Sequence, residues 1–246
     1  MTPAEAGRRF QVLPDAQAVA TEAAARLIAR IAENQMRPAI CLTGGSGPKA
    51  LYALLGSPGY RSRIAWNRVH WFIGDERFVS ADDQRNNMAT AKDIFLNRCA
   101  PQDNIHPIPT DAADPDKAAG LYERELQTFY GARDLDAARP LFDLVLMGLG
   151  PDGHTASLFP GDAALTETGR WVVGVDHAHV EPFVPRVTLT LPALASSREM
   201  LFLVSGEAKR DILTKVMAGA DLPATRARSN GITTWLTDEA AAGHTK

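Results

Sequence analysis

A single histidine follows a long apolar run near the middle of the chain. Residues 144–147 are apolar, and residues 148–153 then contain three glycines and a proline before His154. Such a pattern is typical of a buried parallel strand that enters a tight loop. In open α/β sheets, ligands bind beyond the carboxyl ends of the strands, where a histidine can exchange protons near neutral pH. The same loop adds carboxylate and hydroxyl groups from Asp152, Thr155 and Ser157.

An isolated Asp-Gly-His segment has a second interpretation. Its polar groups often satisfy only their own backbone in a turn. The catalytic interpretation of His154 and Asp152 therefore depends on what the rest of the chain places beside them.

A glycine-rich segment follows the strand expected at residues 39–42. Residues 43–48 read Thr-Gly-Gly-Ser-Gly-Pro and open a helix that we expect to reach residue 55. Backbone N–H groups at a helix N-terminus suit a phosphate, and Gly44, Gly45 and Ser46 would let the backbone approach it. The segment is neither a Walker A sequence nor Gly-x-Gly-x-x-Gly, so it predicts no nucleotide. A tight strand-to-helix turn without a ligand is the alternative.

Charged residues lie at three other predicted element boundaries. Asp75 and Arg77 follow the strand expected at residues 69–73, Arg186 begins another strand, and Lys209 lies near a helix start. The two carboxylates of Asp75 and Glu76 beside Arg77 could form a structural ion pair, and Arg186 and Lys209 could be solvated surface charges. A cation at a helix start is unfavourable to the helix dipole, so a bound anion would explain Lys209.

We expect no metal site. His177 and His179 would share a face of a strand, but a metal needs at least one more ligand and we find none nearby. Activity should therefore survive chelation.

Strands alternate with helices along the chain, which predicts an α/β fold with a mainly parallel sheet and helices on both faces. The region from Trp171 to Leu191 is β-rich and is expected to form a small antiparallel excursion or flap. No linker divides the chain, so we expect one domain over residues 1–246. Predicted strands cover 39–42, 69–73, 105–108, 141–147, 171–175, 187–191, 200–204 and 232–236; predicted helices cover 15–35, 48–55, 87–97, 114–131 and 207–217.

Composition excludes several classes of protein. The 246 residues carry a formal net charge of −3, which disfavours a general nucleic-acid binder. Cys41 and Cys99 have no Cys-x-x-Cys partner, and no window of 18 apolar residues suggests a membrane span. Residues 1–9 lack the apolar core of a secretory signal. We expect a cytoplasmic protein that binds neither membranes nor nucleic acid.

Together these segments resemble 6-phosphogluconolactonases. Four of them match in order, namely residues 42–48, 74–79, 148–161 and 185–191, with 206–209 trailing. The third is long and specific. Gly47 departs from the family, which usually has threonine there, and Asn86 stands where the family often has serine.

The resemblance implies a Rossmann-like fold and hydrolysis of 6-phospho-D-glucono-1,5-lactone in the oxidative pentose phosphate pathway, with no cofactor. It implies that His154 activates water, that Asp152 orients His154, and that Arg77 or loop N–H groups stabilise the developing charge. Asp75 would orient a sugar hydroxyl or Arg77. The phosphate would lie against Gly44, Gly45, Ser46, Arg186 and Lys209.

Two alternatives remain at this point. Glucosamine-6-phosphate deaminases share the fold, but their loop typically continues Gly-His-Ile-Ala-Phe-Asn-Glu, and this chain lacks that glutamate. A non-catalytic sugar-phosphate sensor would need a DNA-binding module, for which this chain has no room. We expect a monomer or a weak homodimer.

Overall fold

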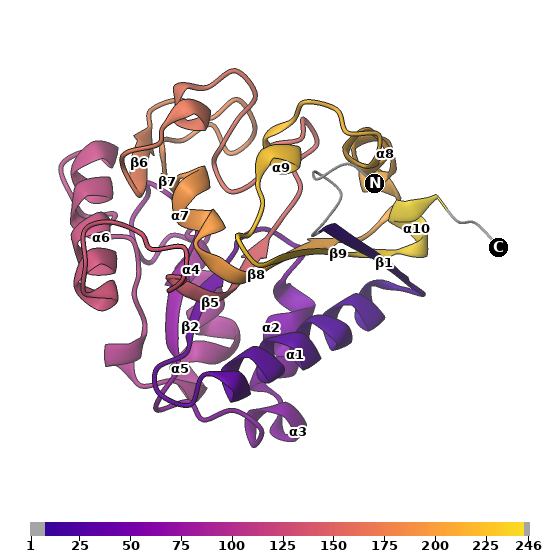
Figure 1. Cartoon of the computed structure of the whole chain (residues 1–246), viewed down its shortest axis with the longest axis horizontal. Coiled ribbons are helices and arrows are strands. Elements are labelled where there is room, and N and C mark those ends of the chain that lie inside the picture. The colour runs from indigo at the N-terminus through magenta and orange to yellow at the C-terminus, as the bar shows by residue number, and fades with distance from the viewer. Residues whose placement is uncertain (1–7, 244–246) are drawn as a thin grey trace.

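The computed structural model describes residues 8–243. Its centre is a six-stranded sheet in which all neighbouring strands are parallel (Figure 1). In order across the sheet the strands are Arg8–Leu13 (β1), Ile232–Asp238 (β9), Ser197–Val204 (β8), Phe142–Met147 (β5), Ala39–Leu42 (β2) and His70–Ile73 (β3). The predicted mainly parallel α/β sheet is confirmed.

Helices cover both faces of this sheet, with α1 and α2 on one side and α7, α8 and α9 on the other (Figure 1). No helix among residues 8–243 is long and apolar enough to cross a bilayer. The helices span Ala16–Glu33 (α1), Lys49–Gly56 (α2), Pro58–Arg61 (α3), Asn87–Ala91 (α4), Asn97–Cys99 (α5), Pro115–Tyr130 (α6), Leu191–Ala195 (α7), Arg210–Met217 (α8), Pro223–Arg226 (α9) and Glu239–Ala242 (α10).

The neighbouring strands β2 and β5, both inside the sheet, are buried along their whole length. This burial on both faces explains why residues 39–42 and 144–147 are continuous apolar runs rather than alternating ones. Within this sheet, the strand that follows β2 along the chain is β3, on one side of it. The strand of this sheet that follows β5 is β8, on the other side. Such a reversal leaves a crevice beyond the carboxyl ends of the two strands, which is where ligands bind in open α/β sheets.

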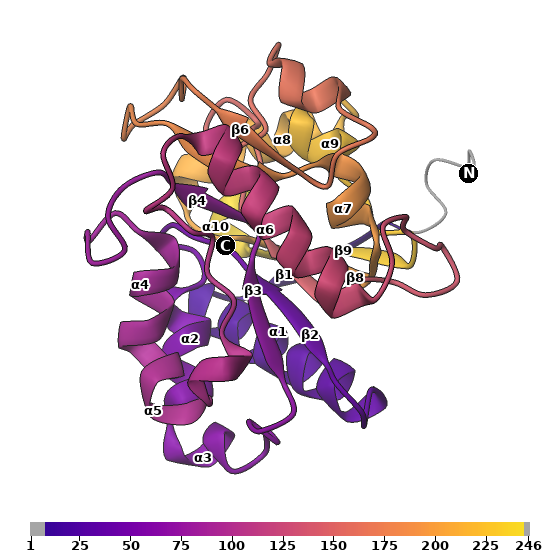
Figure 2. The ribbon, with the colours of Figure 1, turned by 90° about the vertical axis from the view of Figure 1, so that its left-hand side faces the viewer.

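A second, three-stranded antiparallel sheet lies beside the first. It consists of Asp75–Arg77 (β4), Arg186–Leu189 (β7) and Val172–Val175 (β6). The antiparallel excursion expected between Trp171 and Leu191 is therefore confirmed, but it also recruits β4, which the sequence analysis treated only as the end of a strand. Helix α6 packs against this sheet (Figure 2).

Two sequence predictions were wrong. Residues 105–108 form no strand, and a single bridge joins Ile105 to Trp71. Pro107 and Pro109 lack the N–H groups that a ladder needs, so only His106 donates to the carbonyl of Trp71, at 2.8 Å. The expectation that the first strand begins at residue 39 was also wrong, because β1 lies at the edge of the sheet and pairs there with β9.

Two predicted helices are present but less regular than expected. The helix expected at 87–97 runs through α4, a π-helical segment at Lys92–Leu96, and α5. The helix expected at 207–217 begins as a 3₁₀ turn, Glu207–Lys209, before α8. Further 3₁₀ turns lie at Gln102–Asn104 and Ala163–Thr166. Most of the signal-peptide expectation for residues 1–9 lies outside the described residues.

Candidate active site

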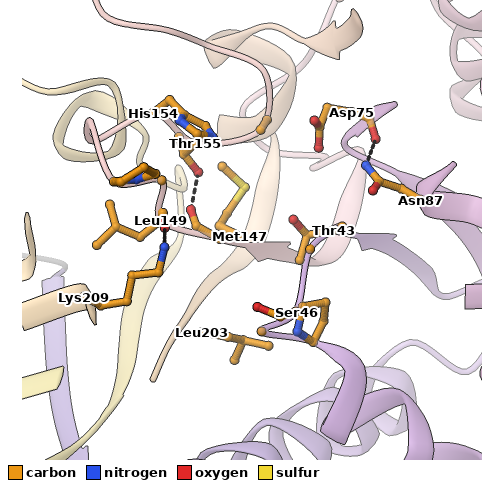
Figure 3. Close-up of a pocket in the computed structure, with 18 of the residues that line it drawn as sticks. Thr43, Ser46, Asp75, Asn87, Met147, Leu149, His154, Thr155, Leu203 and Lys209 are labelled. Atoms are coloured by element: carbon orange, nitrogen blue, oxygen red, sulfur yellow. Dashed lines mark hydrogen bonds between the residues drawn. The ribbon is translucent and has the colours of Figure 1, made fainter. Parts of the chain in front are cut away.

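A pocket of about 230 Å³ opens at the carboxyl ends of β2, β5 and β8. Its walls come from segments far apart in the sequence, including the glycine-rich turn after β2 and the loop after β5. In Figure 3, His154 and Lys209 lie on one side of the pocket and Asp75 and Asn87 on the other. The lining includes most of the predicted site residues: Gly44, Gly45, Ser46, Asp75, Arg77, His154, Arg186 and Lys209. Asp152 does not line the pocket, but its carboxylate contacts the Nδ1 atom of His154.

The loop after β5 holds His154 through Asp152. The Nδ1 atom of His154 lies 2.5 Å from Oδ1 of Asp152, and the same oxygen accepts the backbone N–H of His154 at 3.0 Å. Gly153 has φ of +86°, which turns the chain back so that the two side chains meet. With Nδ1 engaged, Nε2 is the ring nitrogen left to accept a proton.

Gly150 provides the space for this ring. A Cβ atom at position 150 would lie 2.0 Å from Nδ1 of His154, so no other residue fits there without moving the histidine. Phe159 packs against the other side of the ring, with the ring centroids 4.9 Å apart. Gly150 and Gly153 are therefore needed for the position of the His154 ring as well as for the turn itself.

The turn after β2 is held from below by Tyr52. The Tyr52 hydroxyl accepts the N–H of Thr43 at 3.1 Å and donates to the Thr43 carbonyl at 2.7 Å. Gly45 has φ of +85°. Ser46 lies just before α2, whose first residue is Lys49, as the position of Pro48 predicted. The segment thus exposes glycine backbone to the pocket, as a phosphate loop requires.

Arg186 is a buried cation without an acidic partner within ion-pair distance in the described part of the chain. It is 4% exposed, and its guanidinium donates to the carbonyls of Pro182, at 2.8 Å, and Val184, at 3.2 Å. Burial lowers its pKa, and the charge of nearby Asp75 opposes that effect. A buried charge is costly unless it is paired, so an anion in the pocket would relieve that cost.

Lys209 also lines the pocket, on the same side as His154 (Figure 3). Its Nζ atom donates to the carbonyl of Leu149 at 2.6 Å (Figure 3). Burial lowers the pKa of this ammonium group, and the charge of Asp152 opposes the effect. Lys209 thus connects the 3₁₀ turn before α8 to the loop that carries His154.

The charged side chains that line the pocket are three cations and one carboxylate: Arg77, Arg186, Lys209 and Asp75. The pocket is therefore locally cationic, although the whole chain has a formal net charge of −3. That local excess of positive charge is what an anionic ligand needs.

Asp75 and Arg77 do not form the ion pair that the sequence left open. Oδ2 of the buried Asp75 accepts the Ser157 hydroxyl at 2.7 Å. The Arg77 Nη1 atom instead donates to Oδ1 of Asn87 at 2.6 Å and to the Arg85 carbonyl at 2.7 Å. The side chains of Asp75 and Arg77 thus have separate hydrogen-bond partners.

The sequence analysis missed the roles of two polar residues. Ser157 was noted in the loop, but its contact with Asp75 joins segments 82 residues apart. Asn87 entered only as the first residue of the helix expected at 87–97, and its neighbour Asn86 was noted only as a departure from the family pattern. Asn86 caps α4, since its Oδ1 accepts the Ala89 N–H at 2.8 Å. Serine is an equally good cap, which explains the departure from the family pattern.

His177 and His179 lie in the loop between β6 and β7, not in a strand. The ring of His179 packs edge-on against Phe159, with centroids 5.7 Å apart. Within residues 8–243 no group of three or more His, Cys, Asp or Glu side chains is arranged to hold a metal ion.

Comparison with known proteins agrees with this geometry. Residues 14–235 match the family model described as glucosamine-6-phosphate isomerases/6-phosphogluconolactonase. The chain is 39% identical to a 6-phosphogluconolactonase from Streptomyces coelicolor over 93% of its length and 91% of the relative's. It is 41% identical to one from Synechocystis over 82% of each chain.

A solved structure of 6-phosphogluconolactonase from Thermotoga maritima superimposes with a TM-score of 0.80 at 30% identity, covering 94% of this chain and 99% of that one. Sequence and structure therefore agree over nearly the whole chain, including every segment that lines the pocket. The chain belongs to the glucosamine-6-phosphate isomerase/6-phosphogluconolactonase family.

Proposed function

We propose that this protein hydrolyses 6-phospho-D-glucono-1,5-lactone to 6-phospho-D-gluconate, a step of the oxidative pentose phosphate pathway. The observation that carries the proposal is the His154–Asp152 pair, at 2.5 Å, in a pocket whose other charged groups are mostly cationic. A general base and an anion site in one pocket are what hydrolysis of a phosphorylated ester requires. The names of the relatives in the family support the same substrate.

The substrate's phosphate is assigned to the part of the pocket lined by the glycine-rich turn, Arg186 and Lys209. The backbone of residues 44–46, the Arg186 guanidinium and the Lys209 ammonium surround the space available to it. When the phosphate is bound, the lactone carbonyl is held at a defined distance from the base. The two groups then need not find each other by a random encounter. Charge-assisted hydrogen bonds from arginine and lysine are the strongest contacts available for that purpose.

Neutral His154 accepts a proton from water through Nε2 as the water oxygen bonds to the lactone carbonyl carbon. The carbonyl π electrons move to its oxygen and form a tetrahedral oxyanion. When the carbonyl re-forms, the bond to the ring oxygen breaks, and that oxygen receives the proton from His154. Asp152 holds the ring and stabilises the imidazolium that exists between the two transfers.

The negative charge on the tetrahedral intermediate needs hydrogen-bond donors. We assign this role to Arg77, with loop N–H groups as additional donors. Asp75 has one carboxylate oxygen engaged by Ser157, which leaves the other to accept a sugar hydroxyl. In this scheme Asp75 orients the substrate and is not the base.

A deaminase is less well supported by the residues in the pocket. In the deaminase pattern given above, the glutamate lies five residues after the histidine, and that position here is Phe159. Phe159 is 1% exposed and packs on the His154 ring, so an apolar side chain occupies the place of an acid–base group.

We further propose a cytoplasmic enzyme that is a monomer or weak homodimer. The unpaired state of Cys41 and Cys99 supports a reducing setting. Sedimentation velocity at micromolar concentration would measure the oligomeric state.

Turnover is the decisive measurement. The lactone is generated in situ by enzymatic oxidation of glucose 6-phosphate, and acid release is followed above the spontaneous rate. We expect the protein to accelerate hydrolysis strongly and to release no ammonia from glucosamine 6-phosphate. Binding of 6-phosphogluconate with no acceleration would instead indicate a sensor.

A further inference from the structure

We propose that Asn87 is the positioning residue for Arg77, so that Arg77 acts in catalysis only while Asn87 holds it. The inference rests on the proposed function, in which Arg77 stabilises the charge that develops on the lactone oxygen. It assigns to Asn87 a role in orienting another side chain, without contact with the reacting atoms.

Arg77 depends on one nitrogen for its orientation. Its Nη1 atom donates to Asn87 Oδ1, at 2.6 Å, and to the carbonyl of Arg85, at 2.7 Å. Its Nε atom is buried and has no hydrogen-bond partner in the described part of the chain. Asn87 is therefore the only side chain with a described hydrogen bond to this guanidinium, and removing it leaves a single contact to a loop carbonyl.

The amide of Asn87 can hold Arg77 in only one orientation. Its Nδ2 atom donates to the backbone carbonyl of Asp75 at 3.0 Å (Figure 3). A carbonyl oxygen can only accept, so the NH₂ group must face Asp75 and the amide oxygen must face Arg77. The backbone of β4 thus decides which end of Asn87 is presented to the guanidinium.

The backbone of Asn87 is fixed by a separate buried group. Oε1 of Glu76 accepts the N–H of Asn87 at 2.6 Å and that of Arg77 at 2.8 Å, and Oε2 accepts the N–H of Met88 at 2.9 Å. Glu76 is fully buried, and burial raises its pKa to about 7, an effect that the three N–H donors oppose. Glu76 therefore ties the start of α4 to β4, where Arg77 lies.

The side chain of Asn87 also packs against the glycine-rich turn. A Cβ atom at Gly44 would lie 2.0 Å from the Asn87 amide oxygen, so the amide lies directly against the glycine-rich turn. Asn87 is 4% exposed. It thus lies between the turn assigned to the phosphate and the arginine assigned to the reacting carbonyl.

The test is a kinetic double-mutant cycle on the full-length protein with phosphorylated lactone. We expect Asn87→Ala to lower kcat by about 10- to 100-fold with little change in KM, because the lost contact serves the transition state. In an Arg77→Ala background the same substitution should change kcat by less than about threefold, since residues that act as a unit are not additive. Asn87→Ser is used for the same cycle should Asn87→Ala not fold.

Asn86→Ala is the matched control. It removes the cap of α4 and destabilises that helix, but it takes away no described contact of Arg77. It should lower the midpoint of thermal unfolding and leave kcat within about twofold of the wild type.

The outcomes separate the two proposals. A wild-type protein that does not hydrolyse the lactone refutes the proposed function. A wild type that does, combined with equal losses from Asn87→Ala in both backgrounds, refutes the positioning role. An Asn86→Ala loss as large as that of Asn87→Ala also refutes it, because the effect would then come from α4 itself.

Discussion

His154 and Asp152 form a closed pair within a single turn: Nδ1 of the ring lies 2.5 Å from the carboxylate, and the same oxygen accepts the histidine's own N–H. Residues two apart in a loop seldom face one another. Here the positive φ of Gly153 folds the chain back, and the missing side chain of Gly150 leaves room for the ring. The pair is therefore a local structure that can be tested by local substitutions.

Replacing His154 tests the proposed base. His154→Ala should lower kcat by about 10²- to 10⁴-fold, which is the usual contribution of general-base catalysis. Asp152→Asn should lower it by about 10²-fold or more, because an amide can favour the wrong tautomer of the ring. Both are measured by acid release with the spontaneous rate subtracted, beside thermal unfolding. A folded His154→Ala variant with near-normal kcat would make Asp75 the leading candidate for the base.

Substrate truncation tests the phosphate site. Arg186→Ala and Lys209→Ala should each lower kcat/KM for the phosphorylated lactone by roughly 10- to 150-fold, the equivalent of about 1.5–3 kcal/mol for a charge-assisted hydrogen bond. Hydrolysis of unphosphorylated gluconolactone should change much less. Lys215→Ala removes an exposed charge from α8 and serves as the control. Equal losses on both substrates would show that Arg186 and Lys209 do not bind the phosphate.

Two glycines of the same turn should respond differently to a methyl group. A Cβ at Gly44 would overlap the Asn87 amide, whereas a Cβ at Gly47 would lie 3.5 Å from the Leu203 carbonyl, an ordinary contact. Gly44→Ala should therefore lower kcat/KM by about 10-fold or more, and Gly47→Ala should be nearly neutral. Steady-state kinetics of the two variants checks this, and similar values for both would contradict the assigned packing of Asn87.

A half-buried histidine pair outside the pocket predicts a pH-dependent stability. Nδ1 of His70 lies 2.8 Å from Nε2 of His106, and Nδ1 of His106 lies 2.6 Å from Glu125. Burial, the charge of His106 and that of Arg37 lower the pKa of His70 to about 4, from an ordinary value of 6.5. Between these two pH values the unfolded chain binds more protons at this residue than the native protein does.

The free energy of unfolding should therefore be highest above pH 6.5, as far as His70 contributes, and should fall as the pH is lowered towards 4. Thermal unfolding at a series of pH values measures this slope. His70→Gln should flatten it, and substitution of the exposed His177 by Gln should leave it unchanged. A His70→Gln variant with the wild-type slope would assign the effect to other groups.

Local patterns in the sequence determined most elements and the most specific part of the site. Strand β2 is apolar throughout and β5 is apolar from Leu144 to Met147, and the turns after them are rich in glycine, so the positions of these strands follow from local sequence. The side-chain caps of α1 and α6, Asp15 and Asp114, are equally local signals. The candidate base, the phosphate turn and four charged residues could be named because each lies at or near the end or start of such an element.

Only the tertiary structure decided which of these residues meet and what holds them. Arg77 lies opposite Arg186 because β4 pairs with β7 in an antiparallel register, and no local pattern specifies that register. Strand β1 has polar residues at three of its six positions and exists because β9 offers it a free edge. Asn87 has ordinary neighbours in the sequence; its role arises from contacts with Asp75, Arg77 and Gly44, all in other elements. Hydrogen bonding and close packing between distant segments are long-range interactions, so their partners become known only when the chain is folded.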